Sequence, residues 1–378
     1  MGPILILDKS TFQSLGYEEH IELKKHFMEN LTPILAMEIV ADLAKEVKGK
    51  SSEEKVQELA QKFGGSGPPL NISFQDACIS SLIGNYIPMT GQIAVGHGSP
   101  TTGSDGSKGF FVDLHPINES ILRWAKQSFE EEEYDVSAEW RNKTRTFSID
   151  DFQEEINSRH IILPAVKTIE EIPDAANKLL NQISLQEVWF EWIMERLDPP
   201  PILKFQILQR WRNRQSPYFS EFAPYAYFCL KAILILHYVV RRKFIGWKST
   251  NLLDLNYLFY LPFCQVFTSN DKLHRKLAPM LLRSNQSFIV GNKLKSDLNR
   301  LINEKKSMDE AKRRRLAFAL GTYPIPATGS VITKAWETHF GPWKRGSGNR
   351  AIKLSSEEEK LAYNEAEELF EKYNNAKR

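Results

Sequence analysis

The sequence predicts an α/β protein built on a parallel sheet. A continuous apolar run at Ile4–Leu7 ends at an acidic residue, which is typical of a short buried strand. In the C-terminal half, strand-like and helix-like segments alternate along the chain. That alternation is the order of parallel strands joined by crossover helices.

Helices are predicted directly after the first strand. Ser10 or Thr11 caps a short helix. Apolar residues then recur at helical spacing over residues 18–47, with Pro33 at an expected helix start. A further helix is predicted over Glu53–Phe63, where a pair of glycines ends it.

The middle of the chain is less regular. Residues 91–109 contain six glycines in nineteen positions, and we expect a long flexible loop there. A nucleotide-binding role for this loop is a weaker hypothesis than the two given below, because the loop lacks the residue order of a phosphate-binding loop. Residues 110–213 form a mixed, charged region that is interrupted by three consecutive prolines.

The C-terminal half supplies the other predicted strands. The expected elements are a helix over residues 225–243, a helical segment over 252–261, a strand over 265–268, a helix over 271–282, a strand over 287–290 and a final helix over 355–378.

Composition places the chain among globular proteins. Its 378 residues suffice for about two to three domains, and 42% of them are hydrophobic. The 49 Lys and Arg residues nearly cancel the 47 Asp and Glu residues, which leaves a net charge of +2. This balance argues against a protein held on nucleic acid by bulk charge, although it does not exclude a local basic surface.

A cytoplasmic location without a membrane span is expected. The three cysteines form no close pair, which indicates a reducing compartment. The N-terminus lacks the features of a signal peptide. The most apolar stretch, residues 226–245, is interrupted by charged side chains and predicts a buried helix instead of a membrane span.

Four acidic residues stand in positions that need an explanation. Asp8 directly follows one predicted strand and Asp271 comes shortly after another, where parallel sheets place their ligands. Glu38 and Asp254 lie on helical segments with apolar neighbours, where an unpaired charge is costly to bury. A divalent cation such as Mg²⁺ or Mn²⁺ would account for all four, because it prefers carboxylate ligands and removes their mutual repulsion.

The order of these acids carries a family resemblance. The segments ILILDKSTF, PILAMEIV and LLDLNYLFYLPFCQVFTSNDKLH resemble, in that order, the acidic motifs of the PIN-like nuclease superfamily. The resemblance implies a three-layer α/β fold with a central parallel sheet. It also implies hydrolysis of phosphodiester bonds, usually in RNA.

The resemblance assigns a role to each matching residue. It implies that Asp8 and Asp271 bind the metal directly, and that Glu38 and Asp254 complete the shell directly or through water. Ser269 would orient a carboxylate or a metal-bound water. Such a cation activates water for in-line attack and stabilises the leaving oxygen.

The chain departs from a compact PIN-like domain in one respect. About 170 residues separate the second acid from the third. We therefore expect a discontinuous nuclease core over residues 1–47 and 216–300, a mainly helical insertion over residues 48–215, and a basic and helical C-terminal extension over residues 301–378.

Basic residues gather in the C-terminal region. Residues 292–353 hold 14 Lys and Arg against five acids, and tryptophans and a phenylalanine lie nearby. Cations neutralise phosphates and aromatic faces stack unpaired bases, which predicts a surface for single-stranded nucleic acid. The residues expected to bind are Lys312, Arg313, Arg314, Arg315, Lys344 and Arg345. The alternative is a solvated helix face, with the tryptophans anchoring the tail.

Each acid also has an alternative interpretation. Asp8, Asp254 and Asp271 could each cap a helix, and Glu38 could be a solvated or ion-paired helix residue. Two further sites could join the metal site, but a surface role is the expected one for each: Asp42, and the pair Asp113 and His115. His274 could contact phosphate, but a place on the helix surface is expected for it.

A second functional class remains open. The chain could be a non-catalytic or conditionally activated subunit that docks a partner protein through residues 48–215 or the C-terminal helix. By analogy, the resemblance also suggests a toxin or an anti-phage defence effector. The sequence does not separate RNA from DNA as the substrate.

Overall fold

A computed structural model describes residues 2–45, 48–64, 67–95, 99–103, 106, 108–111, 115–146, 148–214, 218–346, 348, 349 and 351–377. The chain divides into two compact units. Unit 1 comprises Met1–Asn30, Cys264–Asn270 and Arg283–Arg378, and unit 2 comprises Leu31–Phe263 and Asp271–Leu282. The bounds of these units differ from those of the expected core, insertion and extension. The division into core, insertion and extension stays a prediction.

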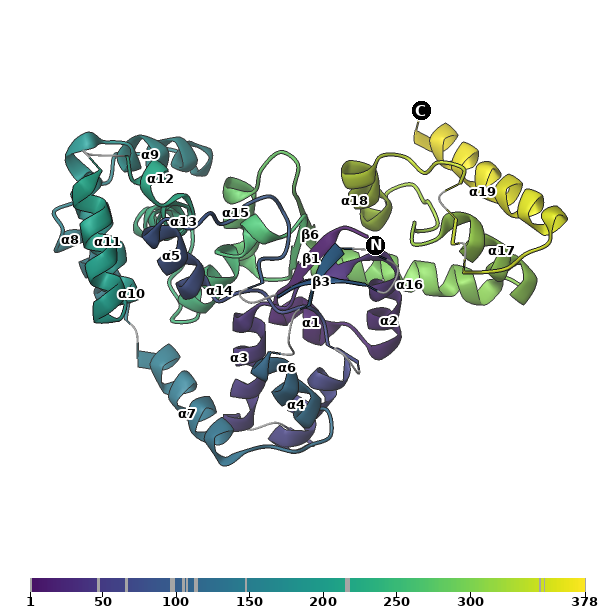
Figure 1. The fold of residues 1–378 in the computed structure, drawn as a ribbon, viewed down its shortest axis with the longest axis horizontal. Coiled ribbons are helices and arrows are strands. Elements are labelled where there is room, and N and C mark those ends of the chain that lie inside the picture. The colour runs from purple at the N-terminus through teal and green to yellow at the C-terminus, as the bar shows by residue number, and fades with distance from the viewer. Residues whose placement is uncertain are drawn as a thin grey trace. The chain divides into compact units, whose positions relative to one another are not determined.

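Unit 1 contains a four-stranded, all-parallel sheet (Figure 1). Its strand order is β2-β1-β5-β6. The strands are β1 (Ile4–Leu7), β2 (Met28–Glu29), β5 (Val266–Ser269) and β6 (Ser287–Val290). This sheet confirms the predicted α/β class.

The strand predictions are close to the observed bounds. The first strand and the last match the expected ranges, because both are apolar runs. β5 begins one residue later than predicted, so Ser269 is the last residue of the strand. β2 was not predicted, because two residues are too few to carry a periodic signal.

β2 also interrupts the region of helical spacing at residues 18–47. Helix α2 (Tyr17–His26) ends before β2. Helix α3 (Pro33–Val40) starts after it, with Pro33 in its first turn and the Thr32 side chain accepting a hydrogen bond from the Leu35 N–H. The expected helix start at Pro33 is therefore confirmed.

Helix α16 (Gly291–Ser307) connects the sheet of unit 1 with its helices. It contacts β5, β6, α1 (Lys9–Ser14), α2 and α18 (Val331–Phe340). Leu294, Leu298 and Leu301 are fully buried and recur at helical spacing.

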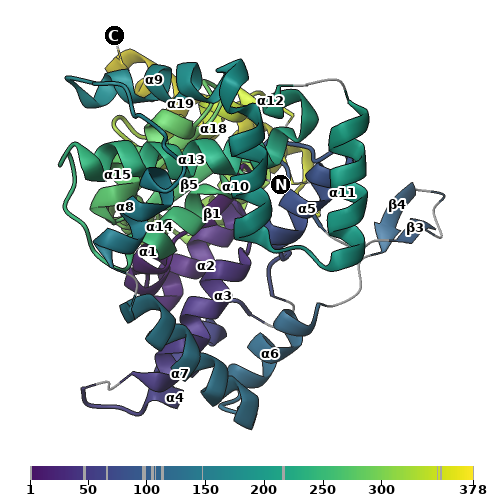
Figure 2. The same ribbon diagram turned by 90° about the vertical axis from the view of Figure 1, so that its left-hand side faces the viewer.

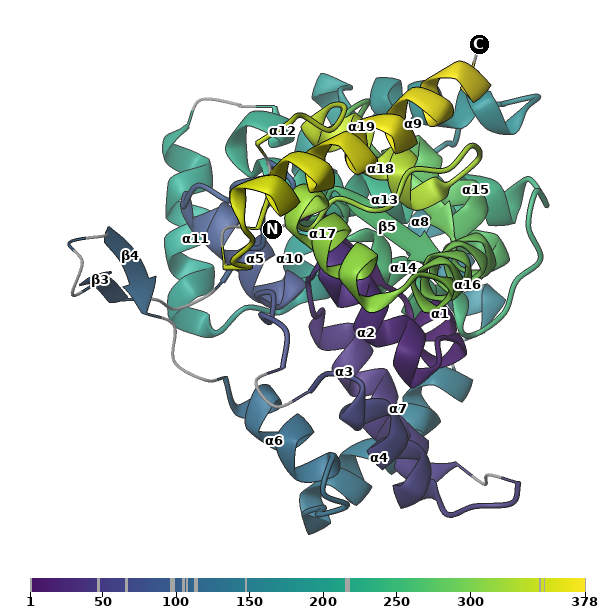
Figure 3. The same ribbon diagram turned by 90° about the vertical axis from the view of Figure 1, so that its right-hand side faces the viewer.

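The last helix packs within unit 1. Helices α17 (Glu310–Leu320) and α19 (Ser356–Lys377) lie side by side (Figure 3). Ala362, Ala366, Phe370 and Tyr373 form the buried stripe of α19. The helix predicted over residues 355–378 is thus present with one face buried and the other exposed.

Unit 2 is mainly helical, and α13 (Pro224–Arg241) is its most buried helix. It is contacted by α5 (Phe74–Ile83), α9 (Ile172–Leu180), α12 (Phe219–Phe222) and α14 (Asn251–Leu258) (Figure 2). The remaining helices of unit 2 are α4 (Ser52–Gln61), α6 (Pro116–Trp124), α7 (Glu131–Thr146), α8 (Ile149–Asn157), α10 (Gln186–Leu197), α11 (Pro201–Asn213) and α15 (Lys272–Leu281). Among the described residues, short 3₁₀ helices also occur at Ala41–Ala44, Ile169–Glu171, Ile183–Leu185 and Leu261–Phe263.

The glycine-rich region contains regular structure that was not predicted. Strands β3 (Ser99–Thr102) and β4 (Lys108–Phe111) pair as an antiparallel hairpin. Glycines between two short strands are typical of a hairpin connection, so the expectation of a loop throughout residues 91–109 is wrong for these strands. Among the helices that the structure describes, none has the length and apolarity to cross a membrane.

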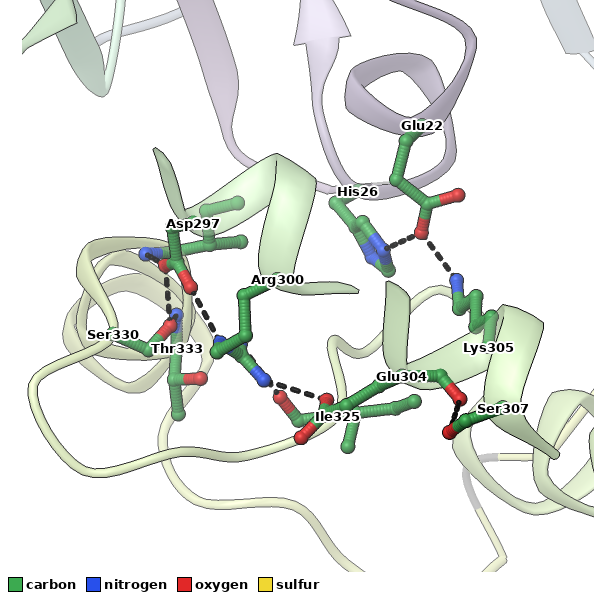
Figure 4. A network of polar contacts seen from close by, with 11 residues as sticks. Glu22, His26, Asp297, Arg300, Glu304, Lys305, Ser307, Ile325, Ser330 and Thr333 are labelled. Carbon is green, nitrogen blue, oxygen red and sulfur yellow. Dashed lines mark hydrogen bonds and ion pairs between the residues drawn. The ribbon is translucent and has the colours of Figure 1, made fainter. Parts of the chain in front are cut away.

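Two buried carboxylates tie the helices of unit 1 together (Figure 4). Asp297 on α16 accepts hydrogen bonds from Arg300 Nε at 2.9 Å, Ser330 Oγ at 2.6 Å and the Ile332 N–H at 3.0 Å. Ser330 caps α18, so this carboxylate connects α16 to the first turn of α18.

Glu22 on α2 is the second buried carboxylate. It lies 2.8 Å from Lys25 Nζ and 3.0 Å from His26 Nε2, and it also accepts a hydrogen bond from Lys305 on α16. Burial raises the pKa of Glu22, but the hydrogen bonds from His26, Lys25 and Lys305 outweigh it and hold the pKa well below its ordinary value.

Substitution of Asp297 by Ala should reduce the free energy of unfolding by about 2–3 kcal/mol, because buried donors lose a charged acceptor. Urea denaturation measures the loss. Glu304→Ala is the matched control, since it removes a more exposed partner of the same Arg300. Equal losses in the two variants would contradict a special role for Asp297.

The contribution of Glu22 should depend on pH. Because its folded-state pKa is depressed, its stabilisation is present above the unfolded-state pKa of about 4.3 and is lost as the pH falls toward the folded-state value. Urea denaturation of wild type and Glu22→Gln should therefore show a clear gap at neutral pH that narrows as the pH falls below about 4. A gap that does not change between those conditions would contradict this assignment.

Candidate active site at the end of the parallel sheet

The carboxyl ends of β1 and β5 form the candidate site. The two strands are neighbours, with β2 beyond β1 and β6 beyond β5. The chain thus extends the sheet in opposite directions from this pair. Ligands of open α/β sheets bind outside the carboxyl ends of the strands at such a point. Asp8 follows β1 here, and Ser269 ends β5.

The Asp8 carboxylate is buried and held by donors from both strand ends. Its side chain accepts hydrogen bonds from Ser10 Oγ at 2.6 Å, Ser269 Oγ at 2.6 Å and the Thr11 N–H at 2.8 Å. The residue is 3% exposed, and Ser269 is fully buried. The bond to the Thr11 N–H makes Asp8 the N-cap of α1, so the capping interpretation is correct for this residue.

Asn270 extends this network to a third element. Its backbone N–H donates to Ser10 Oγ at 3.1 Å, and its side-chain Oδ1 accepts from the Asn292 N–H at 2.8 Å. Asn292 lies in the first turn of α16. The ends of β1, β5 and β6 are therefore linked by one chain of hydrogen bonds. The sequence did not predict that Ser10 donates to Asp8 or that Asn292 belongs to this network.

The start of α16 approaches this network closely. A Cβ atom on Gly291 would lie 2.3 Å from Thr11 Oγ1 and 2.7 Å from Asn270 Nδ2. Both distances are below any that real Cβ atoms adopt. Position 291 therefore requires glycine for steric reasons, a requirement that no local sequence pattern signals.

The other predicted ligands belong to unit 2. Glu38 on α3 is half-buried and accepts a hydrogen bond from the Tyr257 hydroxyl at 2.5 Å. Asp271 caps α15 by accepting from the Leu273 N–H at 2.6 Å. The capping interpretation is therefore correct for Asp271 as well.

Asp254 is half-buried on α14, and its backbone carbonyl accepts a hydrogen bond from His274 Nε2 at 2.7 Å. His274 is fully buried and packs edge-on against Tyr257, with ring centroids 5.7 Å apart. The expected surface role of His274 is therefore wrong. Helical spacing alone could not place this histidine, because burial depends on the helix that covers it.

The predicted catalytic residues lie in different units. Asp8 and Ser269 lie in unit 1, whereas Glu38, Asp254 and Asp271 lie in unit 2. Among the residues that the structure describes, no group of three or more His, Cys, Asp or Glu side chains is arranged to hold a metal ion. A metal shared by the four acids therefore stays a prediction.

Two other suggested sites have different outcomes. Asp42 is 1% exposed and lies 3.6 Å from Arg141 Nη2, so the expected surface role is wrong. Of the pair at positions 113 and 115, Asp113 lies outside the described residues, and His115 caps α6.

The basic C-terminal region is partly neutralised within unit 1. Arg315 forms a two-pronged pair with Glu365 at 2.6 and 3.1 Å, and Arg345 lies 3.0 Å from Glu367. Arg314 donates to the Lys353 carbonyl. By contrast, the side chains of Lys312 and Arg313 have no hydrogen-bond or ion-pair partner within the described chain.

The nearby tryptophans hold the tail to unit 1. Trp336 Nε1 donates to the His26 carbonyl at 2.9 Å, and Trp343 Nε1 donates to the Ala319 carbonyl at 3.1 Å. Trp343 also stacks on Phe370 of α19. These contacts match the anchoring alternative for the aromatic residues. Nucleic-acid binding by the basic residues stays a prediction.

Comparison with protein-family models, with curated proteins and with solved structures finds no match to the chain.

Gly291→Ala should destabilise the protein by about 1–3 kcal/mol, because the added methyl group would displace the side chains of Thr11 and Asn270. Helix propensity alone predicts the opposite sign. Urea denaturation tests the loss, and Gly246→Ala is the control because an added Cβ there meets open space. Unchanged stability in Gly291→Ala would contradict the close packing of the network.

Proposed function

We propose that the chain is a PIN-like, metal-dependent nuclease that hydrolyses phosphodiester bonds, with RNA as its expected substrate. The observation that supports this most is the position of Asp8. A buried carboxylate follows β1 at the point where the sheet extends in two directions, and Ser269 of β5 holds it in place.

The oxygen atoms at these strand ends are of the chemical type that binds a hard divalent cation. Carboxylate and hydroxyl oxygens at strand ends are ligands that Mg²⁺ and Mn²⁺ prefer. Mg²⁺ keeps several waters and is commonly held by one or two carboxylates together with substrate phosphates. The proposal therefore gives Asp8 and Asp271 the direct contacts, and gives Glu38 and Asp254 direct or water-mediated ones.

The residues around Asp8 would serve to orient it. Ser10 and Ser269 donate to the carboxylate from two strand ends, which restricts its rotation. Asn270 in turn donates to Ser10. When bound, the cation would supply an activated water and stabilise negative charge on the leaving oxygen.

Lys312 and Arg313 are the basic residues best suited to contact substrate phosphates. Their side chains have no partner within the described chain, so binding a phosphate would not require an ion pair to break. A role as a toxin or an anti-phage defence effector belongs to the same proposal.

A second candidate function is supported by exposed apolar residues in unit 2. Ile202 and Phe205 stand three positions apart on α11 and are 71% and 67% exposed, and Ile162 is 85% exposed. Exposed apolar patches commonly mark protein–protein contacts. The chain would then be a conditionally activated subunit that docks a partner through residues 48–215. Nuclease activity that appears only in a stable complex would favour this candidate.

The purified full-length chain should cleave single-stranded RNA in the presence of Mg²⁺ or Mn²⁺, and a chelator should abolish cleavage. Asp8→Asn and Asp271→Asn should each reduce the rate at least about a hundredfold, or about 2.7 kcal/mol in the barrier. Asn caps helices about as well as Asp, so these variants keep the caps while they remove the charge.

The control for these variants is Asp309→Asn. Asp309 also caps a helix, since it accepts from the Lys312 N–H at 2.8 Å, but it is exposed on α17. Its variant should retain full activity. Activity retained in both Asp8→Asn and Asp271→Asn would overturn the site assignment.

A further inference from the structure

Unit 1 contains a pocket that the nuclease proposal does not use. Its volume is about 390 Å³, which lies within the range of small-molecule sites. The end of α2, the end of α16, one face of α17 and the segment that follows α17 surround it.

The inner wall of this pocket is apolar. On α17 it is formed by Leu316, Ala317 and Leu320, which share one helix face with Arg313 of the rim. Leu316, Leu320 and Ile325 are each less than 5% exposed, and Tyr323 is 6% exposed. An apolar or aromatic ligand body would bury additional apolar surface against this wall.

The rim of the pocket is cationic. Lys25, Lys305 and Arg313 line it, and none of the described lining residues is acidic. Glu22 pairs with both lysines but does not line the pocket. Three cationic side chains therefore line the pocket, and a single carboxylate offsets their charge. Arg313 has no side-chain partner within the described chain and is exposed.

His26 is part of the wall and does not serve as a ligand-binding group. Its Nδ1 lies 2.8 Å from the Thr322 carbonyl oxygen. Its Nε2 lies 3.0 Å from Glu22 Oε1 (Figure 4). Both ring nitrogens therefore face protein acceptors, and the residue is 2% exposed. These bonds fix the end of α2 against the segment after α17.

We propose that this pocket binds a small organic anion, in which a carboxylate or phosphate group is joined to an apolar or aromatic body. The anionic group would lie at the rim beside Arg313, Lys25 and Lys305. The apolar body would lie against Leu316 and Leu320. An inorganic anion lacks the second part of this recognition, and a neutral apolar molecule lacks the first. The proposal does not rest on the nuclease proposal, although both assign an anion contact to Arg313.

Calorimetric titration of the full-length chain tests this pocket with paired probes. The pairs are octanoate with octanol and adenosine monophosphate with adenosine, and inorganic phosphate is titrated alone. In at least one pair the anion should bind and its neutral partner should bind at least about tenfold more weakly, a difference of 1.4 kcal/mol. The pair that responds distinguishes an acyl ligand from a nucleotide.

Two substitutions connect binding to the pocket. Arg313→Glu reverses the unpaired charge at the rim, and Ala317→Trp fills the space beside the apolar wall. Each should weaken binding of the anion by at least about tenfold. Arg313→Glu alters an exposed side chain, so it keeps the test decisive if Ala317→Trp does not fold.

Lys312→Glu is the matched control. It makes the same change of charge on the same helix, but Lys312 does not line the pocket. Its affinity should stay within about twofold of wild type. Absence of binding by every organic anion, equal binding by the neutral partners, or equal weakening by Lys312→Glu and Arg313→Glu would each overturn the proposal.

Discussion

The parallel pairing of β1 with β5 is the contact on which the described architecture depends. Leu5, Ile6 and Leu7 stand opposite Val266, Phe267 and Thr268, and nearly all of unit 2 lies between these strands in the sequence. Parallel neighbours present their carboxyl ends at the same edge of a sheet. This register brings Ser269 within hydrogen-bond distance of Asp8, although 261 positions separate them.

Asp8 shows how a folding role and a chemical role can coincide in one residue. Its carboxylate caps α1 and also receives hydroxyl donors from two strand ends. Hydrogen-bond donors of this kind offset the cost of burying a carboxylate. The same donors would hold the carboxylate in one orientation for a cation. For this reason the capping and metal-binding interpretations of Asp8 are compatible with each other.

Charge balance along the sequence gives an incomplete account of the C-terminal region. Residues 292–353 have an excess of basic groups, but the acidic partners of several of them lie elsewhere in unit 1. Lys305 and Lys306 pair with acids of α2, while Arg315 and Arg345 pair with acids of α19. Folding therefore leaves fewer unpaired basic side chains than the sequence alone suggests. Lys312 and Arg313 remain without side-chain partners in the described chain, and Arg313 borders a pocket.

Local sequence determined the elements whose signals are contained in a few consecutive residues. The apolar runs at Ile4–Leu7 and Ser287–Val290 predicted two strands, and Pro33 predicted a helix start, because burial and backbone geometry act residue by residue there. Tertiary structure alone decided which of these elements meet. The pairing of β1 with β5, the burial of His274, the steric need for glycine at position 291 and the pocket beside α17 each arise between segments far apart in the chain. No local pattern records such contacts, because their energies depend on register and packing and not on neighbouring residues.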